Sequence, residues 1–347
     1  MQIERDIVFC VEILPQVSRT FAPTIRMLPK NLSLHVTVAY LLCRIADTVE
    51  DDANLSAQEK RAFLNLFADI FRKGGDEYEQ QFGQAVSRIS GKQADIQLIQ
   101  GYNRVLRIYH SFSKEVKRVI GTWVVEMTLG MIKYAQSHGR KKRQFLKSMK
   151  DLDEYTYYVA GTVGHLLTSL FAHFSRKITP SIVQRLDRFS ESFGKGLQLV
   201  NIIRDMTTDL RRGQSYIPQE ILKKYRLTRQ SIFEVENRQQ AEYLFKELIQ
   251  IAVSHLDQAI AYVLTLPKEE ARIRIFCLLP LFWAMQTLRL IQSNTVALLQ
   301  IDSIKISRRV IKIEFFKTLI LTFSNRLTLR HYNKIRKNIA VGALPAV

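Results

Sequence analysis

The sequence predicts an all-α protein. Turn-forming residues are scarce, with Gly 14 and Pro 8 in 347 residues, while Leu, Ile, Gln, Arg and Lys recur throughout. Strand-type alternation of apolar and polar residues is nowhere sustained. No repeat or Gly/Ser linker interrupts the chain. We therefore expect one catalytic domain for residues 1–293 and an appended basic segment for residues 294–347.

Sparse turn signals divide the chain into long helices. Pro29 opens a helix that we expect to reach Asp51, and Pro180 opens the helix that carries Asp205. The apolar stretch 275–288 contains a proline and is shorter than the roughly 18 residues that span a bilayer, so it is predicted to be a buried helix. The expected loops are residues 73–76, 138–140 and 212–214.

Cysteine usage and the first residues indicate the compartment. The three cysteines, Cys10, Cys43 and Cys277, show no paired spacing, so neither a disulfide framework nor a zinc site is expected. The N-terminus lacks the basic and then apolar pattern of a signal peptide. We expect a cytoplasmic monomer without a membrane span, although peripheral contact with a membrane stays open.

A net charge of +19 calls for a polyanionic partner or an explanation through solubility, and nucleic acid, anionic lipid and diphosphate all qualify as partners. From residue 301 to the end, ten basic residues against two acidic ones give a net charge of +8, and apolar residues interleave with them. This pattern is typical of a basic amphipathic helix at a membrane surface, and a solvated helix face is an equally weighted alternative. Nucleic acid is not expected, because the basic loop 140–143 lacks interleaved aromatic residues.

One predicted helix carries a polar stripe on an otherwise apolar surface. Tyr40, Arg44, Asp47 and Asp51 are spaced by four, three and four residues, which places them on one helix face. Their neighbours are mostly Val, Leu, Ile and Ala, so we expect the stripe to be buried or to line a cavity. Buried carboxylates are costly unless a positive charge neutralises them.

A second helix repeats the pattern with Gln198, Asn201, Asp205 and Asp209, spaced by three, four and four residues. If the two helices faced each other, four carboxylates would meet across a gap. Oxygen ligands at that density suit Mg²⁺ together with diphosphate oxygens. Arginines beside the carboxylates would add positive charge for a diphosphate. Internal salt bridges are the alternative interpretation.

Four segments resemble the motifs of the squalene/phytoene synthase family. In chain order they are SRTF at residues 18–21, YLLCRIADTVEDD at 40–52, YTYYVAGTVG at 155–164 and NIIRDMTTDLRRGQSYIP at 201–218. The resemblance implies an all-α isoprenoid-synthase fold with a central cavity. It also implies that two farnesyl diphosphates are joined head to head through a cyclopropylcarbinyl diphosphate, presqualene diphosphate.

The resemblance implies specific residues as well. Asp47, Glu50, Asp51, Asp205 and Asp209 would hold Mg²⁺ against the diphosphates. One departure is Thr208, where family members usually carry an acidic residue, so the second motif is expected to offer fewer carboxylates.

The implied catalytic residues are Tyr155, which matches a tyrosine credited with proton handling, and Tyr40 and Arg44. A core tyrosine is the alternative reading of Tyr155. Val159, Thr162, Val163 and Leu166 follow it at helical spacing and are expected to form the wall of the prenyl tunnel, with ordinary core packing as the alternative. The implied substrate-binding residues are Ser18, Arg19, Phe21, Val159, Leu166, Gln198, Asn201, Arg204, Arg212 and Tyr216.

Two features favour the squalene-forming branch of the family, which reduces the cyclopropyl intermediate with NADPH. They are the DTVEDD form of the first motif and the segments FCLLP at 276–280 and IKISRR at 304–309. A dehydrosqualene or phytoene synthase, which loses a proton instead, is the alternative. A missing Gly-rich dinucleotide fingerprint says little, because an all-α fold has no strand to carry one.

Two more distant alternatives exist. A chain-elongating prenyltransferase or terpene cyclase would not be expected to carry the 155–164 segment. A non-enzymatic helical protein that binds a membrane or nucleic acid is disfavoured by the intact carboxylates of both motifs.

Overall fold

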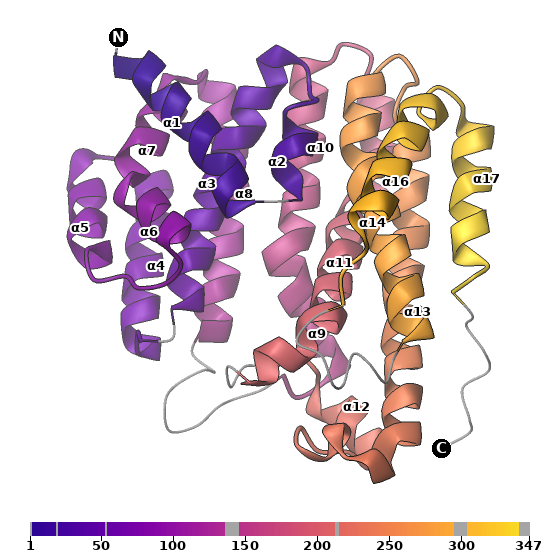
Figure 1. Ribbon diagram of the computed structural model, residues 1–347. Helices are drawn as coiled ribbons and strands as arrows, with labels where there is room; N and C mark the ends of the chain where they lie inside the picture. Colours follow the sequence, from indigo (N-terminus) through magenta and orange to yellow (C-terminus); the bar gives the residue numbers. More distant parts are fainter. Residues whose placement is uncertain are drawn as a thin grey trace. The chain divides into compact units, whose positions relative to one another are not determined.

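The protein is all-α. The computed structural model describes residues 2–18, 20–52, 54–135, 146–211, 215–294 and 304–339. These residues form helices and connecting turns without a strand (Figure 1), so the predicted fold class is confirmed. Two compact units can be recognised. Within the described ranges, the first comprises residues 2–135 and 165–183, and the second comprises residues 146–164 and 184–339.

The first unit is built around α3 (Lys30–Asp51), which packs against α1, α4, α6, α7 and α8. It starts after Pro29 and ends where Asp52 becomes extended, as predicted. The predicted loop at 73–76 is also confirmed, because Gly74 and Gly75 adopt φ values of 68° and 103° there. The other helices are α1 (Gln2–Val17), α2 (Phe21–Ile25), α4 (Ala57–Arg72), α5 (Asp76–Val86), α6 (Gln93–Gln100), α7 (Tyr102–Ser111), α8 (Lys114–Ala135) and most of α10 (Thr162–Phe174).

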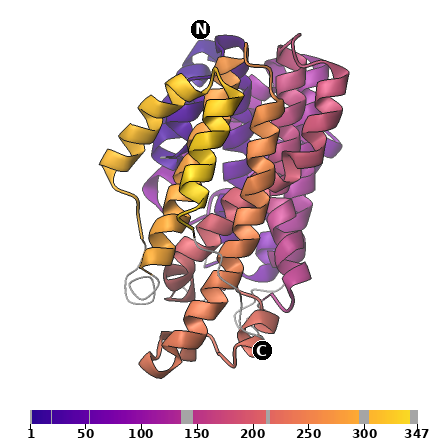
Figure 2. The same cartoon turned by 90° about the vertical axis from the view of Figure 1, so that its right-hand side faces the viewer.

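The second unit contains α11 (Pro180–Arg211), whose predicted start at Pro180 is confirmed, and the pair α13 (Arg238–Thr265) and α14 (Ala271–Ser293). α16 (Arg308–Leu321) and α17 (Asn325–Arg336) pack on that pair (Figure 2). The shorter elements are α9 (Met149–Thr156), the π-helix η2 (Tyr157–Gly161), α12 (Gln219–Lys224) and the 3₁₀ turns η3 (Ser231–Phe233) and η4 (Val235–Asn237).

Backbone contact between the 155–164 segment and α11 explains the glycines of that motif. A Cβ atom at Gly164 would lie 1.9 Å from the carbonyl oxygen of Ser190, and one at Gly194 would lie 1.9 Å from that of Ala160. Only glycine fits at either position. The two segments therefore cross closely. The single-turn π-helix η2 lies in this segment, and such turns are frequent at functional sites.

Within the second unit, a buried arginine on α14 joins the C-terminal helices to the α13–α14 pair. Arg274 on α14 is fully buried. Its Nε donates to the carbonyl oxygen of Thr322 at 2.9 Å, and its Nη2 donates to Oδ1 of Asn325 at 2.7 Å. Its Nη1 donates to the carbonyl oxygens of Val263 and Leu266 at 3.1 and 2.7 Å. The domain boundary expected at residue 293 stays a prediction.

Within the described ranges, three helical segments are long and apolar enough to cross a membrane by length and composition: Lys30–Asp51, Val235–Thr265 and Ala271–Ser293. In the structure, 67%, 50% and 72% of their most apolar windows are buried inside the protein. The predicted burial of residues 275–288 is therefore confirmed. The loops expected at 138–140 and 212–214 lie outside the described residues.

Candidate active site

The first group of candidate residues lies on α3 in the first unit. Arg44 and Asp47 keep 21% and 33% of their side-chain surface exposed, and Asp51 in the last turn is exposed. Between them, Ile45 and Val49 are fully buried. The helix therefore turns its apolar sides into the core and keeps its polar stripe accessible. The stripe is not buried, and its expected place along a cavity stays a prediction.

Arg44 is held by an aspartate that sequence reasoning missed. Its Nε and Nη2 donate to Oδ1 of Asp95 on α6 at 3.0 and 2.9 Å, while its Nη1 lies 3.8 Å from Oδ2 of Asp47. Burial opposes the charge of Arg44, but both carboxylates raise its pKa. Asp95 thus fixes the arginine from the side, and charge-assisted bonds of this kind orient a guanidinium strongly.

The carboxylates at the end of α3 lie where their charged forms are disfavoured. Burial is the main cause that raises the pKa of Asp47 to about 7; Arg44 opposes the shift, and Asp51 and Asp95 add to it. Burial and the charges of Asp51 and Asp47 hold the pKa of Glu50 well above its usual range. Partial desolvation by the surrounding protein also raises the pKa of Asp51, although its side chain stays open to solvent. A bound cation would stabilise this group.

Lys60 on α4 is a second residue that motif reading missed. It is buried, and its Nζ donates to the backbone carbonyl oxygen of Glu50 near the end of α3. Burial lowers the pKa of Lys60, whereas the carboxylates of Glu50, Asp51 and Asp52 oppose that shift. A cation at this position also interacts favourably with the C-terminal end of a helix dipole. Lys60 supplies part of the positive charge that the α3 carboxylates need.

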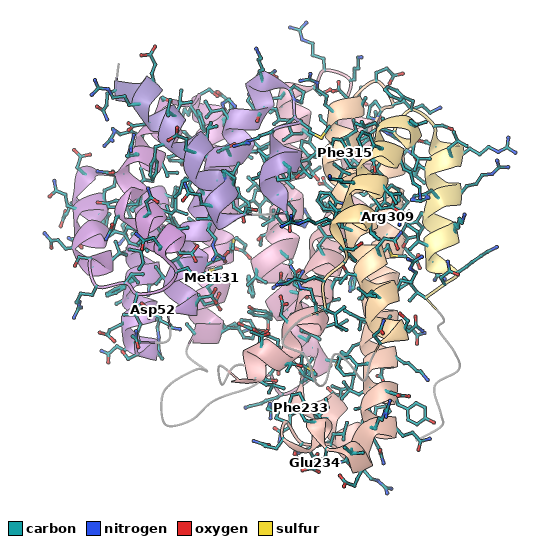
Figure 3. All side chains as sticks on the ribbon, viewed as in Figure 1. Asp52, Met131, Phe233, Glu234, Arg309 and Phe315 are labelled. Atoms are coloured by element: carbon teal, nitrogen blue, oxygen red, sulfur yellow. The ribbon has the colours of Figure 1, made fainter. Side chains whose placement is uncertain are left out.

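Asp52, labelled in Figure 3, follows α3 and has a structural role. Its Oδ2 accepts a hydrogen bond from the backbone nitrogen of Ser90 at 2.8 Å. Its Oδ1 accepts from Ser90 Oγ and from the backbone nitrogen of Asn54, both at 2.8 Å. These bonds tie the end of α3 to the loop before α6, the helix that carries Asp95. Asp52 therefore positions the site's supporting helix.

Three further candidates meet in the first unit. Ser18 Oγ accepts a hydrogen bond from the backbone nitrogen of Phe21 at 3.2 Å. The ring centres of Phe21 and Tyr40 lie 6.0 Å apart. Burial raises the pKa of Tyr40 to about 12, against the effect of a hydrogen bond with Ser18. Arg19, expected beside them, lies outside the described residues.

The second aspartate pair lies on α11 in the second unit. Arg204 pairs with its neighbour Asp205 through two hydrogen bonds, one of them from Nε to Oδ1 at 2.9 Å, and each side chain is about one third exposed. The side-chain nitrogen of Asn201 donates to the amide oxygen of Gln198 at 3.4 Å. Asp209, one turn after Asp205, is half-buried.

Tyr155 and Tyr216 come together in the second unit. Their rings stack with centres 4.8 Å apart and planes 19° from parallel, and Tyr155 is buried. Val159, in the π-helix, is half-buried in the same unit. Leu166 is buried and belongs to the first unit. Arg212 lies outside the described residues.

Lys195 is a buried cation of the second unit that sequence reasoning missed. Its Nζ donates to Asp153 Oδ1 at 2.8 Å and to Glu191 Oε1 at 2.5 Å. It also lies 5.9 Å from the ring centre of Tyr157. Lys195 precedes Gln198 by three residues, so it extends the polar stripe of α11 by one step. That three-residue spacing is the feature of the sequence from which Lys195 could have been predicted.

The donor chemistry of α3 fits Mg²⁺ bound jointly with a substrate. Asp47 and Asp51 are accessible hard oxygen donors whose charges are incompletely neutralised. Among the described residues, no group of three or more His, Cys, Asp and Glu side chains could hold a metal ion by itself. Mg²⁺ commonly takes one or two carboxylates and completes its shell with water and phosphate oxygens. The arrangement suits that mode of binding.

An all-α chain with aspartate pairs and arginines on helix faces has the construction of an isoprenoid-diphosphate enzyme. The chain belongs to the squalene/phytoene synthase family, whose model matches residues 14–310. Among characterised relatives, the squalene synthase of Eremothecium gossypii is 29% identical over 96% of this chain and 76% of its own length. That of Cyberlindnera jadinii is 30% identical over 85% of this chain and 64% of its own length.

The human squalene synthase is 28% identical over 82% of this chain and 63% of its own length. The matched part is thus less than two thirds of the length of several relatives. A solved structure of TcSQS with the ligand BPH1237 shares the fold with a TM-score of 0.84, at 24% identity over 99% of this chain and 94% of that one. A dehydrosqualene synthase structure shares it with a TM-score of 0.65, at 20% identity over 96% and 98% of the two chains.

Within the family, the chain is most similar to squalene synthases, and it is a prenyltransferase of the squalene synthase type. The family expected from the motifs is therefore confirmed.

Proposed function

We propose that this enzyme condenses two farnesyl diphosphates head to head through presqualene diphosphate and, with NADPH, releases squalene. The observation that carries the proposal is the α3 site: Asp47 and Asp51 beside an arginine that Asp95 fixes from outside. Such a site offers cation ligands and a guanidinium to a diphosphate. The squalene synthase names of the relatives support the choice of product.

We propose Asp47, Glu50, Asp51, Asp205 and Asp209 as the residues that hold Mg²⁺. When bound there, Mg²⁺ would neutralise negative charge that develops on a departing diphosphate. Of the five residues, Glu50 has the weakest support as a metal ligand. Its backbone oxygen accepts a hydrogen bond from Lys60, and the pKa of its carboxyl group is held high. Thr208 takes the place where a further carboxylate was expected, so the α11 pair relies on two aspartates.

The chain's own residues have distinct proposed roles. Arg44 presents a guanidinium whose orientation is set by Asp95, and such preorganised charge stabilises a leaving diphosphate at little reorganisation cost. Arg204 is paired with Asp205, so it would have to share its guanidinium with a diphosphate. Tyr155 is proposed to handle the proton lost on ring formation, and its buried ring is held by stacking on Tyr216.

The remaining candidates bind the prenyl chains and the diphosphates. Aromatic faces such as Phe21 and Tyr40 can stabilise an allylic cation and exclude water. Polar groups of α11 would contact the diphosphates. The proposed substrate-binding set is Ser18, Arg19, Phe21, Val159, Leu166, Gln198, Asn201, Arg204, Arg212 and Tyr216.

The reductive step follows from electron balance. Two diphosphate anions leave and one proton is lost on cyclopropane formation, so the joined C30 hydrocarbon is left with a single positive charge. It becomes neutral either by gaining a hydride, which gives squalene, or by losing a proton, which gives dehydrosqualene. The described residues contain no strand-to-helix glycine turn of the kind that binds dinucleotides, so no residue is assigned to NADPH.

Metal-dependent consumption of farnesyl diphosphate tests the proposal. The protein incubated with farnesyl diphosphate and Mg²⁺ should form a C30 diphosphate or hydrocarbon, and omission of Mg²⁺ should stop the reaction. Formation of only C20 or longer linear prenyl diphosphates from added isopentenyl diphosphate would contradict it.

We propose a cytoplasmic monomer that binds prenyl diphosphates and not nucleic acid.

A further inference from the structure

α16 is built with its polar side inward. The side chains that it buries, Glu314 and Thr318, are polar, and Thr322 just after it is also buried. An ordinary surface helix buries its apolar stripe instead. Arg309 and Phe315 mark this helix in Figure 3.

Hydrogen bonds hold the polar side of α16 in place. Glu314 Oε1 accepts from the side-chain nitrogen of Gln286 on α14 at 2.9 Å, and Glu314 Oε2 lies 2.6 Å from Nε2 of His331 on α17. The carbonyl oxygen of Thr322 accepts from the buried Arg274. Two hydrogen bonds to one buried carboxylate, made from two other helices, specify one orientation of α16. The outward direction of the opposite face is therefore fixed.

The outward face of α16 is apolar. Ile313, Phe316 and Ile320 follow one another at spacings of three and four residues, which is one helix stripe, and Phe323 follows in the turn after α16. Phe316, Ile320 and Phe323 are 64%, 70% and 63% exposed. Most of the exposed large apolar residues described in this chain lie between residues 311 and 329, and contiguous exposure of this kind marks an interaction surface.

The same region exposes positive charge and no negative charge among its described residues. Between residues 304 and 339, the single acidic residue is Glu314, and it is buried. The exposed basic residues of this range are Lys305, Arg308, Arg309, Lys312, Lys317, Arg326, Arg330, Lys334 and Lys337.

We propose that the outward face of α16, with the α16–α17 turn, docks on the surface of an anionic lipid bilayer. Apolar side chains flanked by Lys and Arg are the construction of an interfacial helix, which inserts the apolar stripe between headgroups and pairs its cations with lipid phosphates. A second copy of the chain is a poorer partner, because two such faces would bring their positive charges together.

This docking face does not depend on the proposed reaction, since it is defined by exposure and charge alone. It nevertheless complements that reaction, because a hydrocarbon product of thirty carbons has its natural destination in a bilayer. Failure of vesicle binding would leave the proposed condensation untouched, and failure of the condensation would leave the docking face untouched.

Co-sedimentation with vesicles tests the proposal on the full chain. Binding is expected to vesicles of equimolar phosphatidylglycerol and phosphatidylcholine, to fall steeply from about 0.1 M to about 1 M salt, and to be much weaker with phosphatidylcholine alone. The double variant Phe316→Ser, Ile320→Ser should lower the vesicle partition coefficient by about tenfold or more. The double variant Arg309→Glu, Lys312→Glu should lower it by a similar factor.

Matched controls separate the face from general hydrophobicity and charge. Val235→Ser removes an apolar side chain that is 78% exposed on η4, and the pair Lys223→Glu, Lys246→Glu makes the same charge change on α12 and α13. The Val235→Ser control should bind like the parent protein, and the charge control should bind better than the Arg309 and Lys312 variant. Thermal unfolding should show that all variants remain folded, since every changed side chain is exposed.

Three results would overturn the proposal. The first is a parent protein that fails to bind the anionic vesicles at low salt. The second is equal binding by the parent and by the Phe316 and Ile320 variant. The third is a parent protein that light scattering shows to be a dimer, which this variant makes monomeric without any change in vesicle binding, because the face would then bind a second copy.

Discussion

Arg44 on α3 donates two hydrogen bonds to a single oxygen of Asp95, a residue 51 positions further along the chain. Asp95 in turn sits on α6, whose preceding loop is tied to the end of α3 by Asp52. The first aspartate motif is therefore supported by a helix that the motif itself does not contain. This relationship gives the first prediction.

Asp95→Asn should reduce kcat/KM for farnesyl diphosphate by about tenfold to a hundredfold, because Arg44 loses the charge that fixes its direction. The comparison variant is Asp69→Asn, which removes a carboxylate from a pair with Lys73 on the same unit. Steady-state kinetics and thermal unfolding should show lost activity with retained folding for Asp95→Asn alone. Equal kinetics for the two variants would mean that Asp95 has no role in positioning.

Asp47→Asn and Asp205→Asn should each abolish Mg²⁺-dependent turnover without unfolding the chain. Asp47 lies in a group where burial and neighbouring carboxylates already disfavour its charge, so neutralising it should not lower the melting temperature without metal. Added Mg²⁺ with diphosphate should raise the melting temperature of the parent protein more than that of either variant. Unchanged turnover in both variants would remove the metal-site assignment.

Asp6→Asn should destabilise the first unit in a pH-dependent way. Asp6 is fully buried between Nε of Arg104 and Nε of Arg107, at 2.9 and 2.8 Å. The hydrogen bond from Arg107 lowers the pKa of Asp6 most, with Arg104 adding to it and burial opposing it. The stabilisation is therefore complete above the unfolded pKa of about 3.9 and is lost as the pH falls through the lower folded value.

At neutral pH this variant should lose about 1–3 kcal/mol of unfolding free energy in urea denaturation. The difference from the parent protein should shrink as the pH falls below about 4. A difference that stays constant from neutral to acid pH would show that the charge of Asp6 is not what stabilises the contact.

Gly194→Ala should be far more damaging than Gly196→Ala, two residues along the same helix. A Cβ atom at position 194 would lie 1.9 Å from the backbone oxygen of Ala160, whereas one at 196 would first meet the flexible end of Leu256 at 2.9 Å. Backbone cannot give way as a side chain can, so the first change should cost more than about 3 kcal/mol and the second about 1 kcal/mol. Chemical denaturation of both variants measures this, and equal costs would contradict the close helix crossing.

Local spacing predicted what lies within one helix. The stripe of Tyr40, Arg44, Asp47 and Asp51 could be read from the sequence because residues three and four apart share a face, and the bounds of α3 followed from Pro29 and from the end of the apolar pattern. The family motifs then identified Tyr155, and the structure placed it against Tyr216.

Long-range partners could not be predicted in this way. Asp95 and Lys60 reach α3 from other helices, and nothing in their local sequence marks them as partners of Arg44 and Glu50. The orientation of α16 was equally hidden, because periodicity defines an apolar face but not the side to which that face turns. The hydrogen bonds of Glu314 with Gln286 and His331 turn the polar side of α16 inward, so its apolar face points outward.

Product analysis with and without NADPH tests the central claim most directly. Farnesyl diphosphate and Mg²⁺ alone should give presqualene diphosphate, with rearranged alcohols or dehydrosqualene as minor products, because no hydride is available to neutralise the final cation. Saturating NADPH should redirect the product to squalene and consume one NADPH per squalene formed. Dehydrosqualene or phytoene as the sole product at saturating NADPH would contradict the reductive assignment.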